Sequence, residues 1–131
     1  MGFIIDTCVI INVEKNIHSF RQMVAGYEKE KFYLSVITES ELLHGIYRAK
    51  NLAVRNKRRS FVENILREFP VLSIDSPIAR IHAEIWAELL NSGQMIGAHD
   101  LWIAASCMAN GYTLITEDKK AFEKVPGLQI L

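Results

Sequence analysis

The sequence of 131 residues has few of the features that adapt a protein to secretion or to a membrane. It has only two cysteines, Cys8 and Cys107, whose spacing suits neither a disulfide framework nor a zinc knuckle, so we expect both to be reduced core residues. The longest largely apolar run, residues 101–109, is far shorter than the ~20 residues of a membrane span. We therefore expect no contact with a membrane.

The N-terminus also lacks targeting signals. It has no basic start, long apolar run or small-residue cleavage site, and Asp6 stands where a myristoylation motif requires Ser or Thr. These absences favour a cytoplasmic protein. The length is that of one domain, residues 1–131, which can bury a sufficient core without a metal or a disulfide. Any bound metal would therefore serve chemistry.

An excess of one charge is absent as well. The 15 Lys and Arg residues balance the 15 Asp and Glu residues, so no domain-wide basic surface is available for nucleic acid. The charge is nevertheless unevenly placed, because residues 48–59, the basic segment, contain no acid. Its basic residues are Arg48, Lys50, Arg55, Lys57, Arg58 and Arg59. Such a run is usually a solvated helix face, but it can also hold a phosphate backbone.

Short β-prone runs alternate with longer stretches of helical periodicity. The β-prone runs are residues 3–5, 32–36, 71–74 and 112–116, with a further candidate at 128–130. An apolar stripe at helical spacing runs from Ile78 to Leu89, and residues 100–108 are apolar nearly all round. Because parallel strands need crossover connections, this alternation predicts an α/β fold with a mostly parallel sheet of four to five strands flanked by helices.

Four acids stand where the predicted strands end or the following helices begin. They are Asp6, Glu41, Asp100 and Asp118. In open parallel sheets the ligand crevice lies outside the carboxyl ends of the strands, so side chains distant in sequence can converge there. Carboxylates gathered in one place repel one another unless their pKa values rise or cations bind. Oxygen ligands without a Cys/His cluster favour Mg²⁺ or Mn²⁺.

Each acid also has a structural alternative. Glu41 completes Thr38-x-x-Glu41, the pattern of a capping box at the start of a helix. Asp100 can simply favour a helix N-terminus, and Asp118 can cap the short segment 119–123. Asp6 differs, because it follows an apolar strand with no cation nearby in sequence and has little structural reason to be charged. Function is the stronger interpretation at Asp6.

Other chemistries have less support. The sequence contains no G-x-S-x-G elbow, no P-loop and no G-x-G-x-x-G after a strand. An aspartyl phosphatase would need a second acid two residues after the first, where Cys8 stands. The histidines are His18, His44, His82 and His99. They share no metal-ligand spacing, so we expect them at the surface or in packing.

Several motifs together resemble one known family. The chain is similar to the PIN-domain ribonucleases, most closely the VapC-type toxins of bacterial toxin–antitoxin pairs, over nearly its full length. The matching segments are residues 4–7 with Ile10 and Ile11, residues 38–42 with Gly45, residues 98–105, and residues 111–116 running into Asp118 and Phe122. Each motif alone is weak, whereas the set is fairly specific.

The resemblance also implies roles for individual residues. The implied metal-binding acids are Asp6, Glu41, Asp100 and Asp118, with Thr7 and Thr116 as polar supports. Many relatives carry an acid just before the closing Phe, where this chain has Ala121, so that part of the site falls to Asp118 and neighbouring Glu117. The resemblance further implies a homodimer, an antitoxin whose peptide covers the acidic groove, and a structured RNA substrate such as tRNA.

Together these observations predict a Mg²⁺- or Mn²⁺-dependent endoribonuclease in which the ions activate a water for in-line attack. In this hypothesis Asp6 and Asp100 bind the ion directly, Asp118 binds it directly or through water, and Glu41 is a ligand or orients the attacking water. The basic segment holds the RNA. Two alternatives stay open: a non-catalytic module that pairs with an antitoxin as co-repressor on operator DNA, and a metal-dependent nuclease that cuts DNA.

Overall fold

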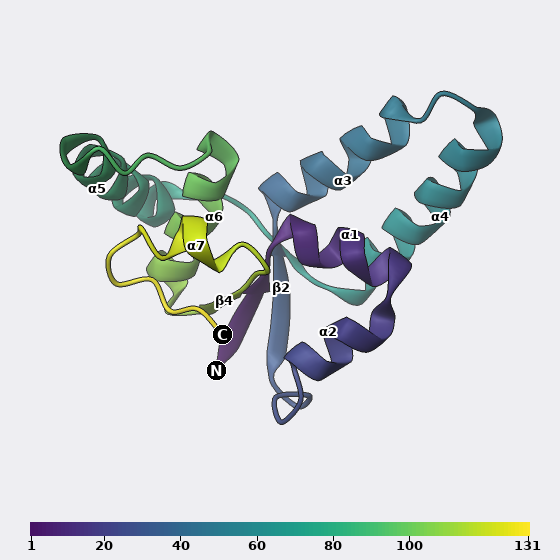
Figure 1. Ribbon diagram of the computed structural model, residues 1–131, viewed down its shortest axis with the longest axis horizontal. Helices are drawn as coiled ribbons and strands as arrows, with labels where there is room; N and C mark the ends of the chain where they lie inside the picture. Colours follow the sequence, from purple (N-terminus) through teal and green to yellow (C-terminus); the bar gives the residue numbers. More distant parts are fainter.

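The alternating pattern of the sequence produces an α/β structure. The computed structural model describes residues 1–131 and contains four strands and seven helices (Figure 1). In chain order they are β1 (Gly2–Ile5), α1 (Thr7–Lys15), α2 (Ile17–Met23), β2 (Lys31–Ser35), α3 (Val36–Arg48), α4 (Leu52–Glu68), β3 (Val71–Leu72), α5 (Ser76–Ser92), α6 (Ala98–Asn110), β4 (Thr113–Ile115) and α7 (Lys119–Phe122). The predicted α/β fold is confirmed.

The four strands form a parallel sheet in the order β3-β2-β1-β4. The buried strand β1 lies inside the sheet, where Phe3 is opposite Phe32 of β2 and Thr113 of β4. Since the strands are parallel, the carboxyl ends of β1 and β4 meet at the same edge. That edge carries Asp6 and Thr116, the residues that directly follow these two strands.

The candidate strand at residues 128–130 is not a strand. It makes only an isolated parallel bridge between Ile130 and Leu114. The N–H of Leu128 donates to the carbonyl of Val125 in a turn. Leu128 therefore does not extend the pairing with β4 that Ile130 makes.

Helices cover both faces of the sheet. Side chains alternate along β1, so that Ile4 packs in a cluster with α5, α6 and α7, whereas Phe3 and Ile5 pack in a second cluster with α1, α3 and α4. Figure 1 shows α5, α6 and α7 on one side of the sheet and α1 to α4 on the other. The nearly all-apolar stretch is α6, which is buried along most of its length.

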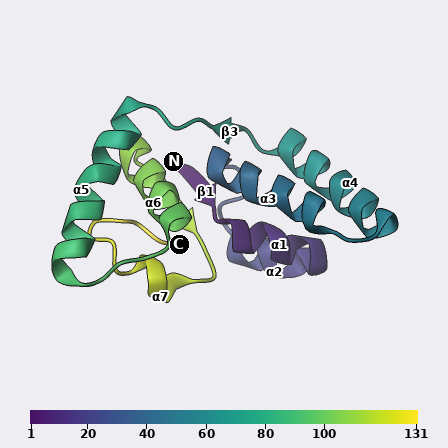
Figure 2. The same ribbon diagram turned by 90° about the horizontal axis from the view of Figure 1, so that it is seen from above.

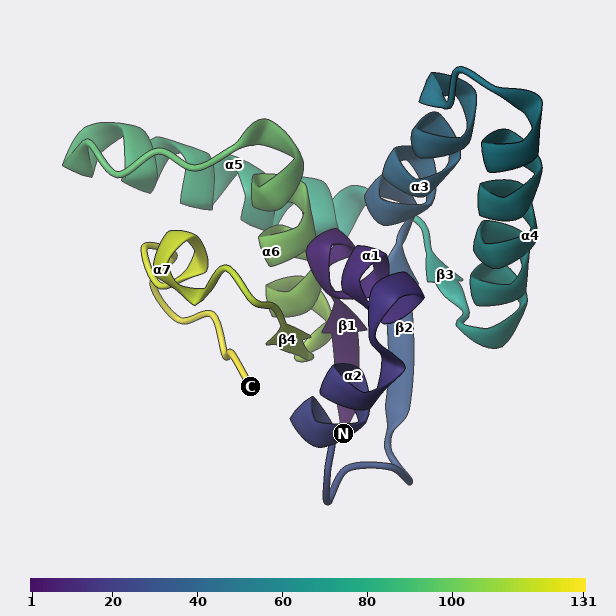
Figure 3. The ribbon, with the colours of Figure 1, turned by 45° about the vertical axis from the view of Figure 1, so that its right-hand side comes forward.

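Two pairs of helices, α3–α4 and α5–α6, extend from the sheet in different directions (Figure 2). Figure 3 shows α1 and the N-terminal parts of α3 and α6 near the carboxyl end of β1. This arrangement places the starts of three helices beside the ends of two strands. None of the helices combines the length and the apolar character that a bilayer crossing requires.

Candidate active site

Asp6 is a buried carboxylate held by three donors. It is 5% exposed and is the N-cap of α1, where Oδ1 accepts from the N–H of Thr7 at 2.9 Å. Its Oδ2 accepts from the hydroxyl of Thr116 at 2.8 Å and from the thiol of Cys8 at 3.1 Å. The expectation that Asp6 lacks a structural role was wrong, because the carboxylate also caps a helix.

Thr116 links two of the acids. Its hydroxyl donates to Asp6 and accepts from the backbone N–H of Asp118 at 3.0 Å. Asp118 in turn caps α7, since its Oδ1 accepts from the N–H of Ala121 at 3.4 Å, as the structural alternative anticipated. Capping uses one oxygen of the exposed Asp118 carboxylate. The other oxygen makes no hydrogen bond within the protein and is available to a ligand.

Glu41 does not belong to a capping box. The helix α3 begins at Val36 with Ser35 as its N-cap, so Glu41 lies in the second turn, beyond the reach of the helix start. Its Oε1 accepts from the hydroxyl of Thr7 at 2.8 Å, and its Oε2 lies 3.6 Å from Nδ1 of His99. The side chain therefore reaches across to α1 and α6 and does not bond to its own backbone.

Asp100 shows that the acids are close to one another. It lies in the first turn of α6, whose N-cap is Gly97 without a side-chain cap bond. Burial and, after it, the negative charges of three other acids together raise the pKa of Asp100 to about 6, against a smaller lowering by His99. Those three acids are Asp6, Glu41 and Asp118. The four acids predicted from the sequence thus lie within electrostatic reach of one another.

The donor chemistry fits a hard divalent cation. Four carboxylates supply only oxygen, the ligand that Mg²⁺ and Mn²⁺ prefer, and the like charges that raise the pKa of Asp100 would be offset by a cation. No group of three or more His, Cys, Asp or Glu side chains is arranged so that it could hold a metal ion. One oxygen of Asp6 and one of Glu41 each accept a hydrogen bond from a threonine hydroxyl.

Two side chains beside the acids were not assigned there from the sequence. Cys8 was expected in the core but is half-buried at Asp6, and burial is the main reason why its pKa rises to about 11. His99 was expected only at the surface or in packing; it is exposed, and it also faces Glu41. The signal for Cys8 was its place in the first turn after a strand-end acid, and the signal for His99 was its adjacency to Asp100.

The remaining predicted residues take different places. Glu117 is exposed and accepts a hydrogen bond from the side chain of Asn12 on α1. Cys107 is a buried free cysteine of the core, as expected. His82 is a packing residue, whose ring stacks on Trp102 with a centroid separation of 3.5 Å. His18 and His44 are exposed.

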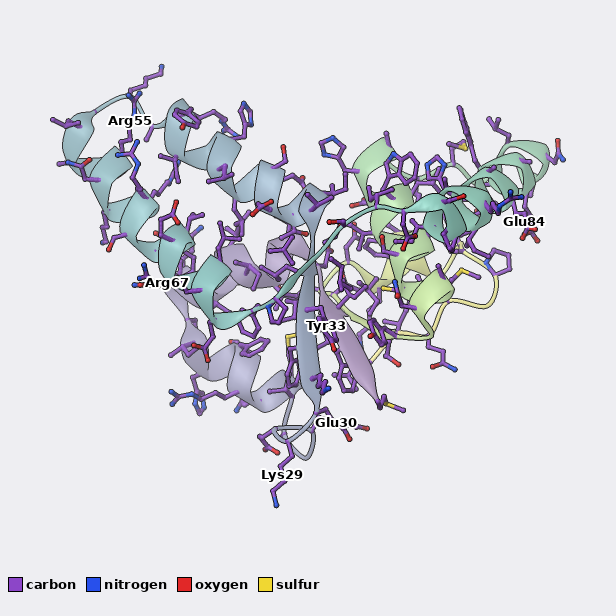
Figure 4. The ribbon with its side chains drawn as sticks, turned by 180° about the vertical axis from the view of Figure 1, so that it is seen from behind. Lys29, Glu30, Tyr33, Arg55, Arg67 and Glu84 are labelled. Atoms are coloured by element: carbon purple, nitrogen blue, oxygen red, sulfur yellow. The ribbon has the colours of Figure 1, made fainter.

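The basic segment covers the end of α3, the connection and the first part of α4. Arg48, Lys50, Lys57 and Arg59 are exposed, whereas Arg55 and Arg58 are half-buried. Arg55 donates to the carbonyl of Ala49 at 2.8 Å, and Arg58 donates to the carbonyl of Gly45 at 2.9 Å. These two arginines therefore join α4 to the end of α3. Figure 4 shows Arg55 at the end of the hairpin distant from the sheet.

A cavity lies between the basic segment and Glu41. It has a volume of about 220 Å³, and its walls include Glu41, Arg48 and Arg58 together with Glu14 and Lys15 of α1. One carboxylate of the acidic group and two arginines of the basic segment thus open onto the same space. An anion in this cavity would lie beside the acidic group.

Comparisons with known proteins agree with this arrangement. A family model described as the PIN domain matches residues 3–128. Ribonuclease VapC1 of Rickettsia felis is 35% identical over 131 residues, covering 100% of this chain and 96% of the relative. The tRNA(fMet)-specific endonuclease VapC of Salmonella typhimurium is 29% identical over 134 residues, covering 99% and 96%.

Solved structures give the same result. VapBC-1 from nontypeable Haemophilus influenzae superposes with a TM-score of 0.88 at 26% identity, covering 100% of this chain and 97% of the other. DNA-bound VapBC from Salmonella typhimurium has a TM-score of 0.88 at 29% identity, with the same coverage. The resemblance seen in the sequence motifs is confirmed. The chain belongs to the PIN-domain family, in its VapC branch.

Proposed function

We propose that this protein is a Mg²⁺- or Mn²⁺-dependent endoribonuclease that acts in the cytoplasm as the toxin of a toxin–antitoxin pair. Its reaction would be hydrolysis of phosphodiester bonds in structured RNA, with tRNA as the first candidate. The observation that carries the proposal is the convergence of four acids from separate elements: Thr116 bonds to both Asp6 and Asp118, and the charges of Asp6, Glu41 and Asp118 raise the pKa of Asp100. Relatives named ribonuclease or tRNA-specific endonuclease support the choice of RNA.

The proposed metal-binding residues are Asp6, Glu41, Asp100 and Asp118. When bound there, a divalent cation supplies a water of lowered pKa and stabilises the charge on the leaving oxygen. The protein supplies rigidity. Thr116 and Cys8 donate hydrogen bonds to Oδ2 of Asp6, and Thr7 donates one to Oε1 of Glu41. Both carboxylates are therefore oriented before the substrate binds.

The proposal explains an otherwise unfavourable arrangement. Four negative charges near one another cost free energy in the metal-free protein, and partial burial of Asp100 increases that cost. The caps formed by Asp6 and Asp118 do not require Glu41 and Asp100 to lie beside them, and the core is formed by two apolar clusters on the faces of the sheet. A bound cation is the simplest compensation for the charge.

The basic segment supports an RNA substrate. The exposed side chains of Arg48, Lys50, Lys57 and Arg59 are free to contact phosphates, and Arg48 and Arg58 line the cavity that reaches Glu41. In our proposal the RNA backbone follows the α3–α4 hairpin toward the acids. Arg55 would contribute mainly by holding the hairpin together, since it donates to backbone carbonyls.

Relatives also support the proposed partners. The similar structures from Haemophilus influenzae and Salmonella typhimurium are VapBC complexes, and on this ground we propose a cognate antitoxin. We also propose a homodimer, as the resemblance implies. The Salmonella complex is bound to DNA, and this supports the alternative of a non-catalytic module that acts with the antitoxin as co-repressor on operator DNA. In that alternative the acids have no catalytic role.

Cleavage of total RNA by the purified protein tests the proposal. We expect Mn²⁺-dependent cleavage at defined ends, loss of cleavage in Asp6→Asn, and no change in Glu84→Gln, which alters an exposed acid on α5 (Figure 4). Asparagine is a good N-cap, so Asp6→Asn keeps the helix cap while removing the charge. Equal cleavage in EDTA, or unchanged cleavage by Asp6→Asn, would exclude the mechanism.

A growth assay and a panel of substrates distinguish the alternative functions. Growth arrest on expression should be relieved by Asp6→Asn if the protein is a nuclease, whereas a pure binding module would not depend on that carboxylate. A panel of matched RNA and DNA substrates decides between ribonuclease and deoxyribonuclease activity. Preferential cleavage of DNA would retain the site but change the substrate class.

A further inference from the structure

A chain of two hydroxyl groups ends on Glu41. The hydroxyl of Thr7, at the start of α1, donates to Oε1 of Glu41 at 2.8 Å. The same Thr7 oxygen lies 2.9 Å from the hydroxyl oxygen of Thr38, which is on α3 one turn before Glu41. Thr38 is 0% exposed and Thr7 is 7% exposed, so water does not compete for these bonds.

The direction of the two hydrogen bonds follows from the number of protons. A threonine hydroxyl carries one proton, and the proton of Thr7 points to the carboxylate of Glu41. Thr7 must therefore accept from Thr38, whose proton has no other acceptor within reach. Each bond polarises the next toward the carboxylate, and the low exposure of both hydroxyls strengthens this effect.

We infer that Thr38 is a positioning residue for Glu41 and acts through Thr7. The inference rests on the proposed function, because it assigns Glu41 a role at the acidic group. Without the proton of Thr38, the hydroxyl of Thr7 loses one of its two partners and can rotate away from the carboxylate. Glu41 then samples more orientations, and the binding of a cation or substrate must restrict them, which lowers affinity through the loss of side-chain entropy.

A purely structural role for Thr38 is the competing explanation. In that explanation the buried Thr38, one turn before Leu42 on α3, stabilises the helix whatever Glu41 does. The two explanations differ in what they predict for an isosteric substitution. Valine has nearly the shape of threonine but no hydroxyl, so it leaves no large void while breaking the chain to Glu41.

The experiment compares Thr38→Val and Thr38→Ser with a matched control, Thr113→Val. Thr113 is a buried threonine of β4 whose hydroxyl donates to the side chain of Gln129, away from the acids. We expect Thr38→Val to lower kcat for RNA cleavage roughly 10-fold with KM changed less than about twofold, and to weaken Mn²⁺ binding to a similar extent. We expect Thr38→Ser, and the Thr113→Val control, to stay within about twofold of the parent protein.

A double-mutant cycle on Mn²⁺ affinity distinguishes the two explanations, because a purely structural role of Thr38 would not depend on Glu41. In a Glu41→Ala background, measured by calorimetric Mn²⁺ titration, Thr38→Val should cause no further loss of affinity, because its effect passes through Glu41. Equal losses in both backgrounds would overturn the inference, as would unchanged affinity and kcat in a folded Thr38→Val protein. If Thr38→Val does not fold, Thr38→Ala is read in the same way.

The same data distinguish failure of this inference from failure of the proposed function. If Glu41→Ala retains full cleavage and Mn²⁺ affinity, Glu41 has no role at the site and both statements are wrong. If Glu41→Ala impairs both while Thr38→Val impairs neither, the proposed function stands and only the positioning role of Thr38 is lost.

Discussion

The hydroxyl of Thr116 donates to Oδ2 of Asp6 at 2.8 Å, joining residues 110 positions apart in the chain. The bond exists because β1 and β4 are parallel neighbours, so the residues that follow them lie at one edge of the sheet. The same hydroxyl accepts from the backbone N–H of Asp118. One threonine thereby fixes the relative positions of two acids that the sequence places far apart.

Thr116 can therefore be tested as a support of the site. We expect Thr116→Val to lower RNA cleavage by roughly 10- to 100-fold, because it removes a donor to Asp6 and an acceptor for the Asp118 N–H. Thr116→Ser keeps the hydroxyl and should retain most of the activity. Cleavage rates at saturating Mn²⁺ measure the difference, and equal rates for the two variants would remove Thr116 from the site.

Asp100→Asn should stabilise the metal-free protein at neutral pH. The folded state raises the pKa of Asp100 from 3.8 to about 6, so between these values it binds more protons than the unfolded state. The contribution of Asp100 to stability therefore falls as pH rises from about 4 to 6 and remains unfavourable above that range. Because the group is only half-buried, screening reduces the gain on substitution to about 1 kcal/mol, or a few degrees in Tm.

Thermal unfolding in EDTA measures this effect. At pH 7.5 we expect a higher Tm for Asp100→Asn than for the parent, and at pH 4 almost no difference. Glu84→Gln, at an exposed acid of α5, should change neither. Added Mg²⁺ should reverse the order at pH 7.5 by stabilising the parent through binding. A lower Tm for Asp100→Asn in EDTA would contradict the charge repulsion inferred from the structure.

Cys8 should react slowly with thiol reagents although it is partly exposed. Its pKa of about 11 leaves little thiolate at neutral pH, and the thiolate is the reactive form. The rate of modification in the native protein should rise steadily from pH 7 to pH 9, and Cys107, which is fully buried, should react only after unfolding. Rapid modification at pH 7, complete within the mixing time, would contradict the environment described for Cys8.

The basic segment should divide into two kinds of residue. Lys57→Gln and Arg59→Gln remove exposed charges, so we expect weaker RNA binding and an unchanged Tm. For each charge removed, the slope of the logarithm of the binding constant against the logarithm of salt concentration should become shallower by about one or less. Arg55→Gln removes a donor to the carbonyl of Ala49 and should lower Tm. Binding titrations over a range of salt concentrations, paired with thermal unfolding, separate the two. A lower Tm for Lys57→Gln and Arg59→Gln would contradict this division.

Some features of the site could be predicted from sequence because they depend on local chemistry. The apolar runs at residues 3–5 and 112–116 identified two strands, and the acids that follow them could be expected at one edge once the strands were taken as parallel. The capping-box alternative for Glu41 was wrong, because α3 begins at Val36 with Ser35 as its N-cap, earlier than the pattern at Thr38 indicated. The cap formed by Asp6 was missed because a strand-end acid and a helix N-cap have the same local pattern.

The sequence by itself determined the α/β class, the approximate positions of the four strands and the four acids to consider, since periodicity and residue type are properties of short segments. Only the tertiary structure decided which polar groups support those acids. Thr116 reaches Asp6, Thr7 and Thr38 reach Glu41, and His99 faces the same glutamate from α6. Such contacts depend on distances of a few ångströms between segments that meet only when the sheet and its helices pack.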